Sequence, residues 1–160
     1  MHPNVRLVTD ALLADDAVDG AGQPSAVRVL PDAVTTAAAA AAALGIEVGQ
    51  IANSLVFSAD GEPVLVMTSG AHRVDTAKVA ALLGIDALKR ATPEFVREHT
   101  GQAIGGVAPV GHPKSLRTLV DTALAEYGEI WAAGGIPHAV FPTTYSELVR
   151  VTGGTPTEVA

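Results

Sequence analysis

The fold is decided by the segment Ile51-Ala52-Asn53-Ser54-Leu55-Val56-Phe57-Ser58-Ala59-Asp60-Gly61-Glu62-Pro63-Val64-Leu65-Val66-Met67-Thr68-Ser69. Both halves are rich in β-branched and other apolar residues, and the Asp60-Gly61 pair between them is a typical signal for a turn between antiparallel strands. We therefore expect a hairpin of two strands, residues 51–57 and 64–69, at the centre of a sheet.

Helix and strand signals surround this hairpin. Thr35 or Thr36 can cap the alanine-rich run that Gly45 ends, and Thr144 begins a capping box with Glu147. The expected helices cover residues 4–16, 37–43, 74–83, 92–101 and 144–151, and further strands are expected at 26–30, 116–120, 129–133 and 138–141. Because these elements follow no regular βαβ period, we predict the fold class α/β (α+β), with a mixed, curled, barrel-like sheet flanked by helices. Residues 1–160 are expected to form a single domain.

Composition excludes several function classes. The 160 residues are 48% hydrophobic and include no cysteine, so disulfides and thiolate chemistry are not available. Neither a secretion signal nor a membrane-length apolar run is present, so we expect a cytoplasmic protein with no membrane partner. The net charge is −7, but seven of the ten basic residues lie between positions 73 and 117. This basic zone indicates either a phosphate-binding surface or the solvated faces of helices.

The segment Gly105-Gly106-Val107-Ala108-Pro109-Val110-Gly111-His112-Pro113 is the strongest candidate for a ligand-binding loop. Glycine has no Cβ to hold a ligand away from the main chain, and proline fixes φ, so such a loop presents bare amides. It predicts the floor of an active site, with a tight connection between strands as the alternative. It is not a phosphate-binding Walker loop, because His112 stands where the lysine belongs.

Asn53 is the second candidate, because alternation in its strand puts this carboxamide on the same face as Ile51, Leu55 and Phe57. A carboxamide among apolar neighbours needs partners, which are either main-chain groups or a ligand. The histidines have no metal-ligand spacing, so no metal site is expected. His112 or His138 can assist proton transfer, and a structural role is the alternative for each.

Five ordered segments together resemble the YbaK/ProX-type aminoacyl-tRNA deacylase family, the editing domains associated with prolyl-tRNA synthetase. The similarity covers nearly the whole chain. It rests on residues 36–57, Ser69-Gly70-Ala71-His72-Arg73-Val74-Asp75 with Lys78, residues 91–101, residues 105–112, and Ala132-Ala133-Gly134-Gly135.

The resemblance implies hydrolysis of the ester that joins a wrong amino acid to the 3′ end of tRNA, without a cofactor and with help from the terminal ribose hydroxyl. Taken together with the glycine-proline loop and the basic zone, it predicts the following roles: catalysis for Asn53, Gly105 and Gly106; substrate binding for Pro109, Gly111, His112 and His138; tRNA binding for Arg73, Lys78 and Lys114. Pockets of this kind sort amino acids mainly by size, and one methylene changes the binding energy by about 1–3 kcal/mol.

One position departs from the family pattern. The family commonly carries a lysine where this chain has Asn53, and asparagine is shorter and uncharged. Two hypotheses follow. The first is a free-standing editing hydrolase whose partner is mischarged aminoacyl-tRNA, with prolyl-tRNA synthetase as a further candidate partner and a homodimer left open. The second is a catalytically reduced homologue that binds tRNA ends, a nucleotide or an amino acid.

Overall fold

The computed structural model describes all residues from Met1 to Ala160 and confirms the central hairpin. Strands β2 (Ile51–Ala59) and β3 (Glu62–Ser69) are antiparallel, and their register runs from the pair Ala52 and Ser69 to the pair Ala59 and Glu62. Gly61 turns the chain with φ at +92°, a conformation that glycine adopts without steric cost.

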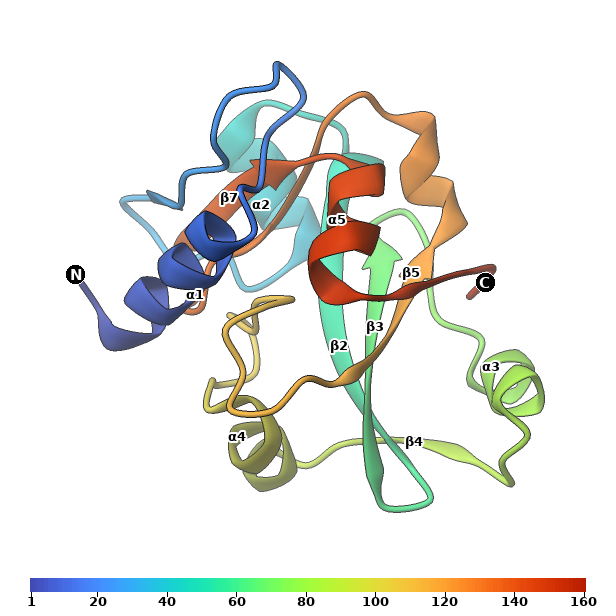
Figure 1. Cartoon of the computed structure of the whole chain (residues 1–160). Helices are drawn as coiled ribbons and strands as arrows, with labels where there is room; N and C mark the ends of the chain where they lie inside the picture. The colour runs from blue at the N-terminus through green and yellow to red at the C-terminus, as the bar shows by residue number, and fades with distance from the viewer.

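The hairpin is the middle of a mixed eight-stranded sheet in the order β1-β7-β6-β2-β3-β5-β8, with β4 paired to β2 outside this path. The other strands are β1 (Arg28–Val29), β4 (Leu88–Arg90), β5 (Arg117–Asp121), β6 (Ile130–Ala133), β7 (Ala139–Thr143) and β8 (Thr155–Thr157). Parallel pairs join β2 to β6, β3 to β5 and β5 to β8, whereas the remaining pairs are antiparallel. The predicted α/β class with a mixed sheet is confirmed (Figure 1).

Five α-helices flank the sheet, and the expected caps at Thr36, Gly45 and Thr144 are all present. They are α1 (Pro3–Ala14), α2 (Ala37–Leu44), α3 (Thr76–Leu83), α4 (Pro93–Thr100) and α5 (Tyr145–Thr152), with 3-10 turns η1 (Val48–Gln50) and η2 (Thr122–Glu126). The Thr36 hydroxyl accepts from the Ala39 amide, and Gly45 ends α2 with φ at +67°. None of the helices is long and apolar enough to cross a membrane.

Some expected boundaries were wrong. Helix α3 begins at Thr76 instead of residue 74, because the Asp75 side chain accepts from the Lys78 amide and so caps it there. The expected strand 26–30 shortens to Arg28–Val29, where it pairs with β7. Strands β4 and β8 were not predicted, because strands of three residues form only by pairing with neighbouring strands and have no local signal of their own.

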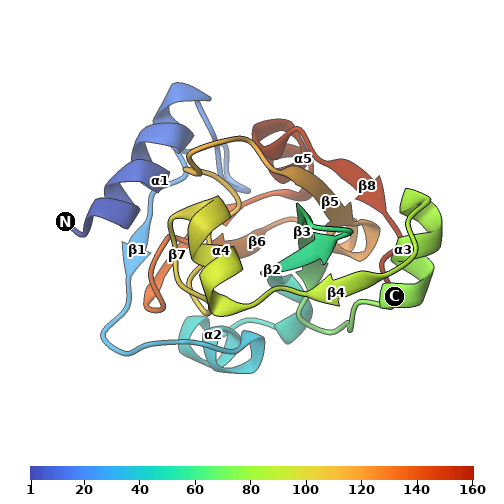
Figure 2. The same cartoon turned by 90° about the horizontal axis from the view of Figure 1, so that it is seen from below.

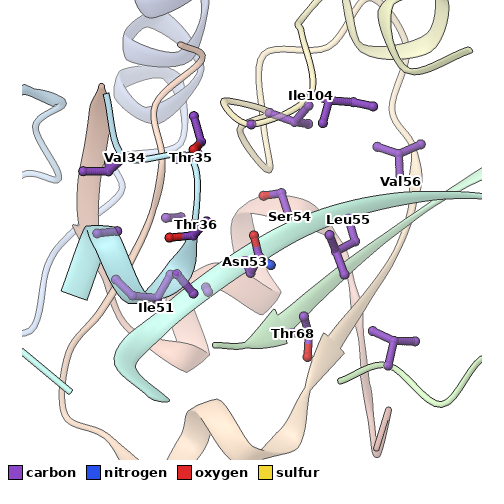
Figure 3. Close-up of a pocket in the computed structure, with 18 of the residues that line it drawn as sticks. Val34, Thr35, Thr36, Ile51, Asn53, Ser54, Leu55, Val56, Thr68 and Ile104 are labelled. Carbon is purple, nitrogen blue, oxygen red and sulfur yellow. The ribbon is translucent and has the colours of Figure 1, made fainter. Parts of the chain in front are cut away.

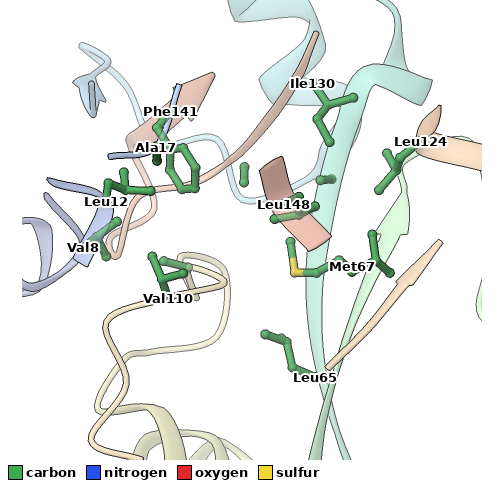
Figure 4. Close-up of a cluster of buried hydrophobic side chains, with 14 of the residues drawn as sticks. Val8, Leu12, Ala17, Leu65, Met67, Val110, Leu124, Ile130, Phe141 and Leu148 are labelled. Carbon is green, nitrogen blue, oxygen red and sulfur yellow. The ribbon is translucent and has the colours of Figure 1, made fainter. Parts of the chain in front are cut away.

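The core has three clusters of buried side chains, and β2 contributes to all of them. Ala52 and Val56 face the largest cluster, which α1 and α5 cover with Val8, Leu12 and Leu148 (Figure 4). Leu55 and Phe57 face the second cluster, beneath α3. Ile51 belongs to the third, beneath α2, and Figure 2 shows α1 and α2 on opposite sides of the strands. Asn53 therefore lies between the clusters that α2 and α3 cover.

Candidate functional site

A cavity of about 750 Å³ lies along β2, between α2 and the loops that follow β3, β4 and α4. This volume is in the usual range for a small-molecule site, about 300–1,000 Å³. The pairing of β2 explains why the cavity forms there. One edge of β2 is paired with β3, but the other edge meets β6 only at residues 51–52 and β4 only at residues 57–59. Residues 53–56 have no neighbouring strand on that edge.

The Asn53 side chain lines this cavity and has no hydrogen-bond partner within the chain. As the alternation predicted, it shares a face of β2 with Leu55, and Figure 3 shows both side chains on the opposite face from Ser54 and Val56. Of the two partners that the sequence left open for Asn53, main-chain groups are thus excluded. The carboxamide is half-buried and free to bind a ligand with one acceptor and two donor hydrogens.

A histidine in the cavity wall contacts a buried carboxylate behind it. The Nδ1 atom of His72, in the loop after β3, lies 3.1 Å from Oδ2 of Asp121, at the end of β5. The Asp121 carboxylate is almost fully buried and also accepts from the Ser69 amide at 3.0 Å and the Ala123 amide at 3.0 Å. A carboxylate can only accept, so Nδ1 carries the hydrogen of a neutral His72 ring and Nε2 is its acceptor.

His72 lines the cavity, and its side chain keeps 38% of its surface exposed. This pair was not predicted as a functional unit. His72 was identified only as part of a motif and Asp121 not at all, because 49 residues separate them and only the parallel pairing of β3 with β5 brings them together. A signal that was available is the position of Asp121 directly after an apolar strand.

The glycine-proline loop contributes to the cavity through Gly105 and Val107. The main-chain N–H groups of both residues have no partner within the chain, and Gly105 has φ at +96°. Gly106 differs. Its amide donates to the Ala103 carbonyl at 3.2 Å, and a Cβ there would meet the Ile136 carbonyl carbon at 2.5 Å. The expectation of bare amides therefore holds for Gly105, whereas Gly106 is needed for close packing.

The second half of the loop lies elsewhere. Pro109, Gly111 and His112 surround a separate hollow of about 160 Å³ beside α1 and α5, so the structure does not bring them together with Asn53. Gly111 packs on the main chain of α1, where a Cβ would lie 3.2 Å from the Leu7 carbonyl carbon. His112 bonds through Nε2 to the Ala108 carbonyl at 2.7 Å, and burial lowers the pKa of its ring.

The remaining predicted residues are also dispersed. The neighbours of His138 line the cavity but its own side chain does not, and its carbonyl accepts from the Leu30 amide at 2.6 Å. Arg73 lines the cavity. Lys78 donates to the Ala160 carbonyl at 2.8 Å instead, and Lys114 is exposed beside the smaller hollow.

Arg90, which the sequence analysis did not single out, joins Arg73 in lining the cavity. Neither guanidinium pairs with a carboxylate, so two free positive charges lie there in a chain of net charge −7. Arg90 pairs with Phe57 across β2 and β4, which puts it on the Asn53 face of the sheet. No group of three or more His, Cys, Asp and Glu side chains is arranged to hold a metal ion.

Comparison with known proteins identifies the family of this chain. Residues 31–151 match the family described as "Aminoacyl-tRNA editing domain". The chain is 40% identical over 81 residues to a proline–tRNA ligase of Nitratidesulfovibrio vulgaris strain DP4, a match that covers 51% of the chain and 14% of the ligase. The chain therefore spans a small part of that ligase. It is also 31% identical over 110 residues to the uncharacterized protein YwhH of Bacillus subtilis, which covers 68% of the chain and 69% of YwhH.

A crystal structure described as a "putative trans-editing enzyme for prolyl tRNA synthetase" is similar over 99% of this chain and 98% of its own, with 43% identity and a TM-score of 0.89. The family match covers most of the sheet and the whole wall of the cavity. The chain belongs to the aminoacyl-tRNA editing domain family, the YbaK/ProX family that also includes the editing domain of prolyl-tRNA synthetase.

Proposed function

We propose that this protein is a trans-acting deacylase that hydrolyses the ester between a wrongly attached amino acid and the 3′ end of tRNA. One observation carries the proposal: a single cavity is lined by Asn53, by Gly105 and Val107 with their unpartnered amides, and by His72, which Asp121 contacts from behind the wall. An ester hydrolase needs donors for a developing oxyanion and an acceptor for the proton of water, and this cavity has both.

In the proposed reaction, water attacks the ester carbonyl carbon, and the carbonyl oxygen takes up the negative charge. The Gly105 and Val107 amides and the Asn53 amide hydrogens stabilise that charge. His72 accepts the proton of the attacking water at Nε2, while Asp121 holds the ring by its Nδ1–H. The proton then passes to the departing ribose oxygen, and the products are free amino acid and uncharged tRNA. The neighbouring ribose hydroxyl helps to hold the water.

Arg73 and Arg90 are the cations that best fit the phosphate of the terminal nucleotide, since both are free and both line the cavity. Gly106, Pro109, Gly111 and His112 shape the loop and support Gly105 from outside the cavity. His138 supports the turn beside them, and Lys114 is available for a phosphate further along the tRNA. The synthetase whose products are corrected is prolyl-tRNA synthetase, as the similarity to its editing domain suggests.

Asn53 is the observation that favours a second candidate, a binding protein with reduced catalysis. An uncharged carboxamide stands where the family commonly has lysine, so the charge that lysine would add to the cavity is missing. Incubation with tRNA charged separately with alanine, cysteine, serine and proline distinguishes the two. Release of one amino acid well above the rate in buffer supports the deacylase. Retained tRNA binding with no release from any of the four supports the binding protein.

The Asn53→Lys variant tests whether Asn53 is a specialisation of the cavity or a loss of function. If the cavity is specialised, the lysine side chain fills space that the preferred amino acid needs, and the variant loses its preference among the four amino acids. If Asn53 is a defect, release rises in the variant. We expect the first result, because the cavity already contains two unpaired guanidinium groups.

A further inference from the structure

The unpaired edge of β2 has a defined direction of its main-chain groups. The Gly70 amide donates to the Ile51 carbonyl at 2.8 Å, on the β3 side of β2. Main-chain groups of successive residues in a strand point to opposite edges, so those of Asn53 and Leu55 also point to β3. Those of Ser54 and Val56 point to the other edge, where neither β6 nor β4 reaches.

This edge lies inside the cavity, because Ser54 and Val56 both line it. Ile104 and Gly105 of the loop after α4 line the same cavity, and a Cβ added at Gly105 would be in van der Waals contact with Thr35. Figure 3 shows the Ser54 and Val56 side chains on the side of β2 that faces Ile104. An N–H and a C=O of the same residue are thus left without a strand partner, next to the Asn53 carboxamide.

We infer that the aminoacyl group of the substrate binds to Ser54 as a strand of one residue, an inference that rests on the proposed function. An aminoacyl ester contains the N–Cα–C=O unit of a single residue, which is the unit that an antiparallel partner of Ser54 would supply. The Ser54 N–H donates to the ester carbonyl oxygen, and the Ser54 carbonyl accepts from the α-ammonium group. Residues opposite each other in this arrangement share a face, so the substrate side chain lies on the Ile104 side.

This pairing defines the substrate class. It requires an acyl group with an amino group on its α-carbon, because the Ser54 carbonyl otherwise loses its donor. It also adds the Ser54 N–H to the donors that polarise the ester carbonyl. An acyl ester of the same size without the amino group is expected to bind more weakly, since hydrogen bonds from a charged donor contribute more than neutral ones.

The test uses stable amide analogues of the substrate and the full-length protein. The probes are 3′-alanylamino-3′-deoxyadenosine, its seryl counterpart, and the propionyl counterpart, which lacks only the amino group. We expect the alanyl or seryl analogue to bind at least about tenfold more tightly than the propionyl analogue. We also expect it to shift the NMR amide resonance of Ser54 and slow the hydrogen exchange of this amide.

The Ser54→Pro variant removes the N–H that the inference uses. It removes no main-chain bond to β3, so the strand can accept proline there, and the one side-chain contact it removes is that of the Ser54 hydroxyl with Met67 Sδ at 3.2 Å. Val29→Pro is the matched control. The Leu30 amide donates to the His138 carbonyl, so by the same alternation the Val29 N–H points away from β7, in an exposed strand outside the cavity. We expect Ser54→Pro to lose at least tenfold in affinity for the alanyl or seryl analogue and Val29→Pro to change it by less than twofold.

The outcomes separate this inference from the proposed function. If the amino analogues bind no better than the propionyl analogue, or bind without any change at the Ser54 amide, the inference is wrong and the deacylase proposal stands. If no analogue binds and no charged tRNA is hydrolysed, both are wrong. Should Ser54→Pro fail to fold, the NMR and affinity measurements on the unaltered protein still decide.

Discussion

The Nδ1 atom of His72 and the Oδ2 atom of Asp121 lie 3.1 Å apart, and this contact joins the loop after β3 to the end of β5. Asp121 is held in place by main-chain amides on both sides, so its carboxylate is fixed before any ligand binds. The ring of His72 is thereby turned with Nε2 away from Asp121. An orientation of this kind is what a general base requires.

We expect His72→Ala to lower the rate of amino acid release by about 10²- to 10⁴-fold, the usual contribution of a general acid or base. Single-turnover release from charged tRNA measures this, with circular dichroism to verify the fold. Asp121→Asn should lower the rate as well, because the amide no longer fixes the ring. A His72→Ala rate within twofold of the unaltered protein would show that the ribose hydroxyl activates water without the histidine.

Two adjacent glycines are expected to respond differently to alanine. Gly106→Ala places a Cβ 2.5 Å from the Ile136 carbonyl carbon and 2.7 Å from the Pro137 nitrogen, so the free energy of unfolding should fall by about 1–3 kcal/mol. Gly105→Ala meets nothing closer than Thr35 at 3.6 Å, but its positive φ costs about 1–2 kcal/mol and its Cβ occupies the cavity wall.

Urea denaturation measures the stability of both variants, and Gly128→Ala is the matched control, because no atom lies within 4 Å of its added Cβ. Only Gly105→Ala should weaken catalysis beyond what its stability loss explains. Equal stability of Gly106→Ala and Gly128→Ala would contradict the close packing described for the loop.

The parts of the fold that could be predicted from sequence are those set by local contacts. The Asp60-Gly61 turn, the Thr36 cap and the alternation that exposes Asn53 each depend on residues a few positions apart. By contrast, the unpaired stretch of β2, residues 53–56, depends on where the pairing with β6 and β4 ends. This cannot be predicted from the residues of β2 themselves.

The candidate site follows the same division. Asn53 and Gly105 were identified locally and meet in one cavity, but His72 became significant only through the distant Asp121. The glycine-proline loop was expected to form one surface. Instead, only its first half lines the cavity, because Gly111 in the second half packs against the main chain of α1. This contact is 104 positions away in sequence and cannot be predicted from glycine content alone.

Stability is expected to depend on pH through His112. Burial lowers the pKa of His112 below its ordinary value of 6.5, so the unfolded chain binds a proton more readily than the folded one. The contribution is therefore fully present above pH 6.5 and is lost as the pH falls through the pKa of the folded state. Thermal unfolding between about pH 7.5 and 5 should show falling stability in the unaltered protein and a flatter profile in His112→Gln.

Between about pH 7.5 and 5, the effect of His112 on stability can be measured apart from that of the acidic groups. The Arg150 side chain lowers the pKa of Glu147 from 4.5, so the stability that this carboxylate contributes is lost only at more acidic pH. Parallel profiles for His112→Gln and the unaltered protein would contradict the buried, neutral state of His112.

Asn53 is expected to act as a hydrogen-bond donor. Asn53→Ala should lower kcat/KM for amino acid release by about tenfold, the value of one hydrogen bond of about 1–1.5 kcal/mol. Asn53→Asp, which has the same shape, should lose more, because it replaces the donor by a negative charge beside the developing oxyanion. A rate for Asn53→Asp equal to or above that of Asn53→Ala would show that Asn53 acts through shape or as an acceptor.

Arg73 and Arg90 are expected to carry the salt dependence of tRNA binding. Each guanidinium that neutralises a phosphate releases condensed counterions, and for single strands the slope of log K against log salt changes by about 0.7 per contact. Arg73→Gln and Arg90→Gln should each reduce the slope by about this amount, whereas Arg6→Gln on α1 should not.

The Lys78→Gln variant tests the prediction from sequence that Lys78 binds tRNA. Because the Lys78 ammonium is bound to the Ala160 carbonyl, its loss should leave the slope unchanged, and a fall of about 0.7 would return Lys78 to the tRNA-binding surface.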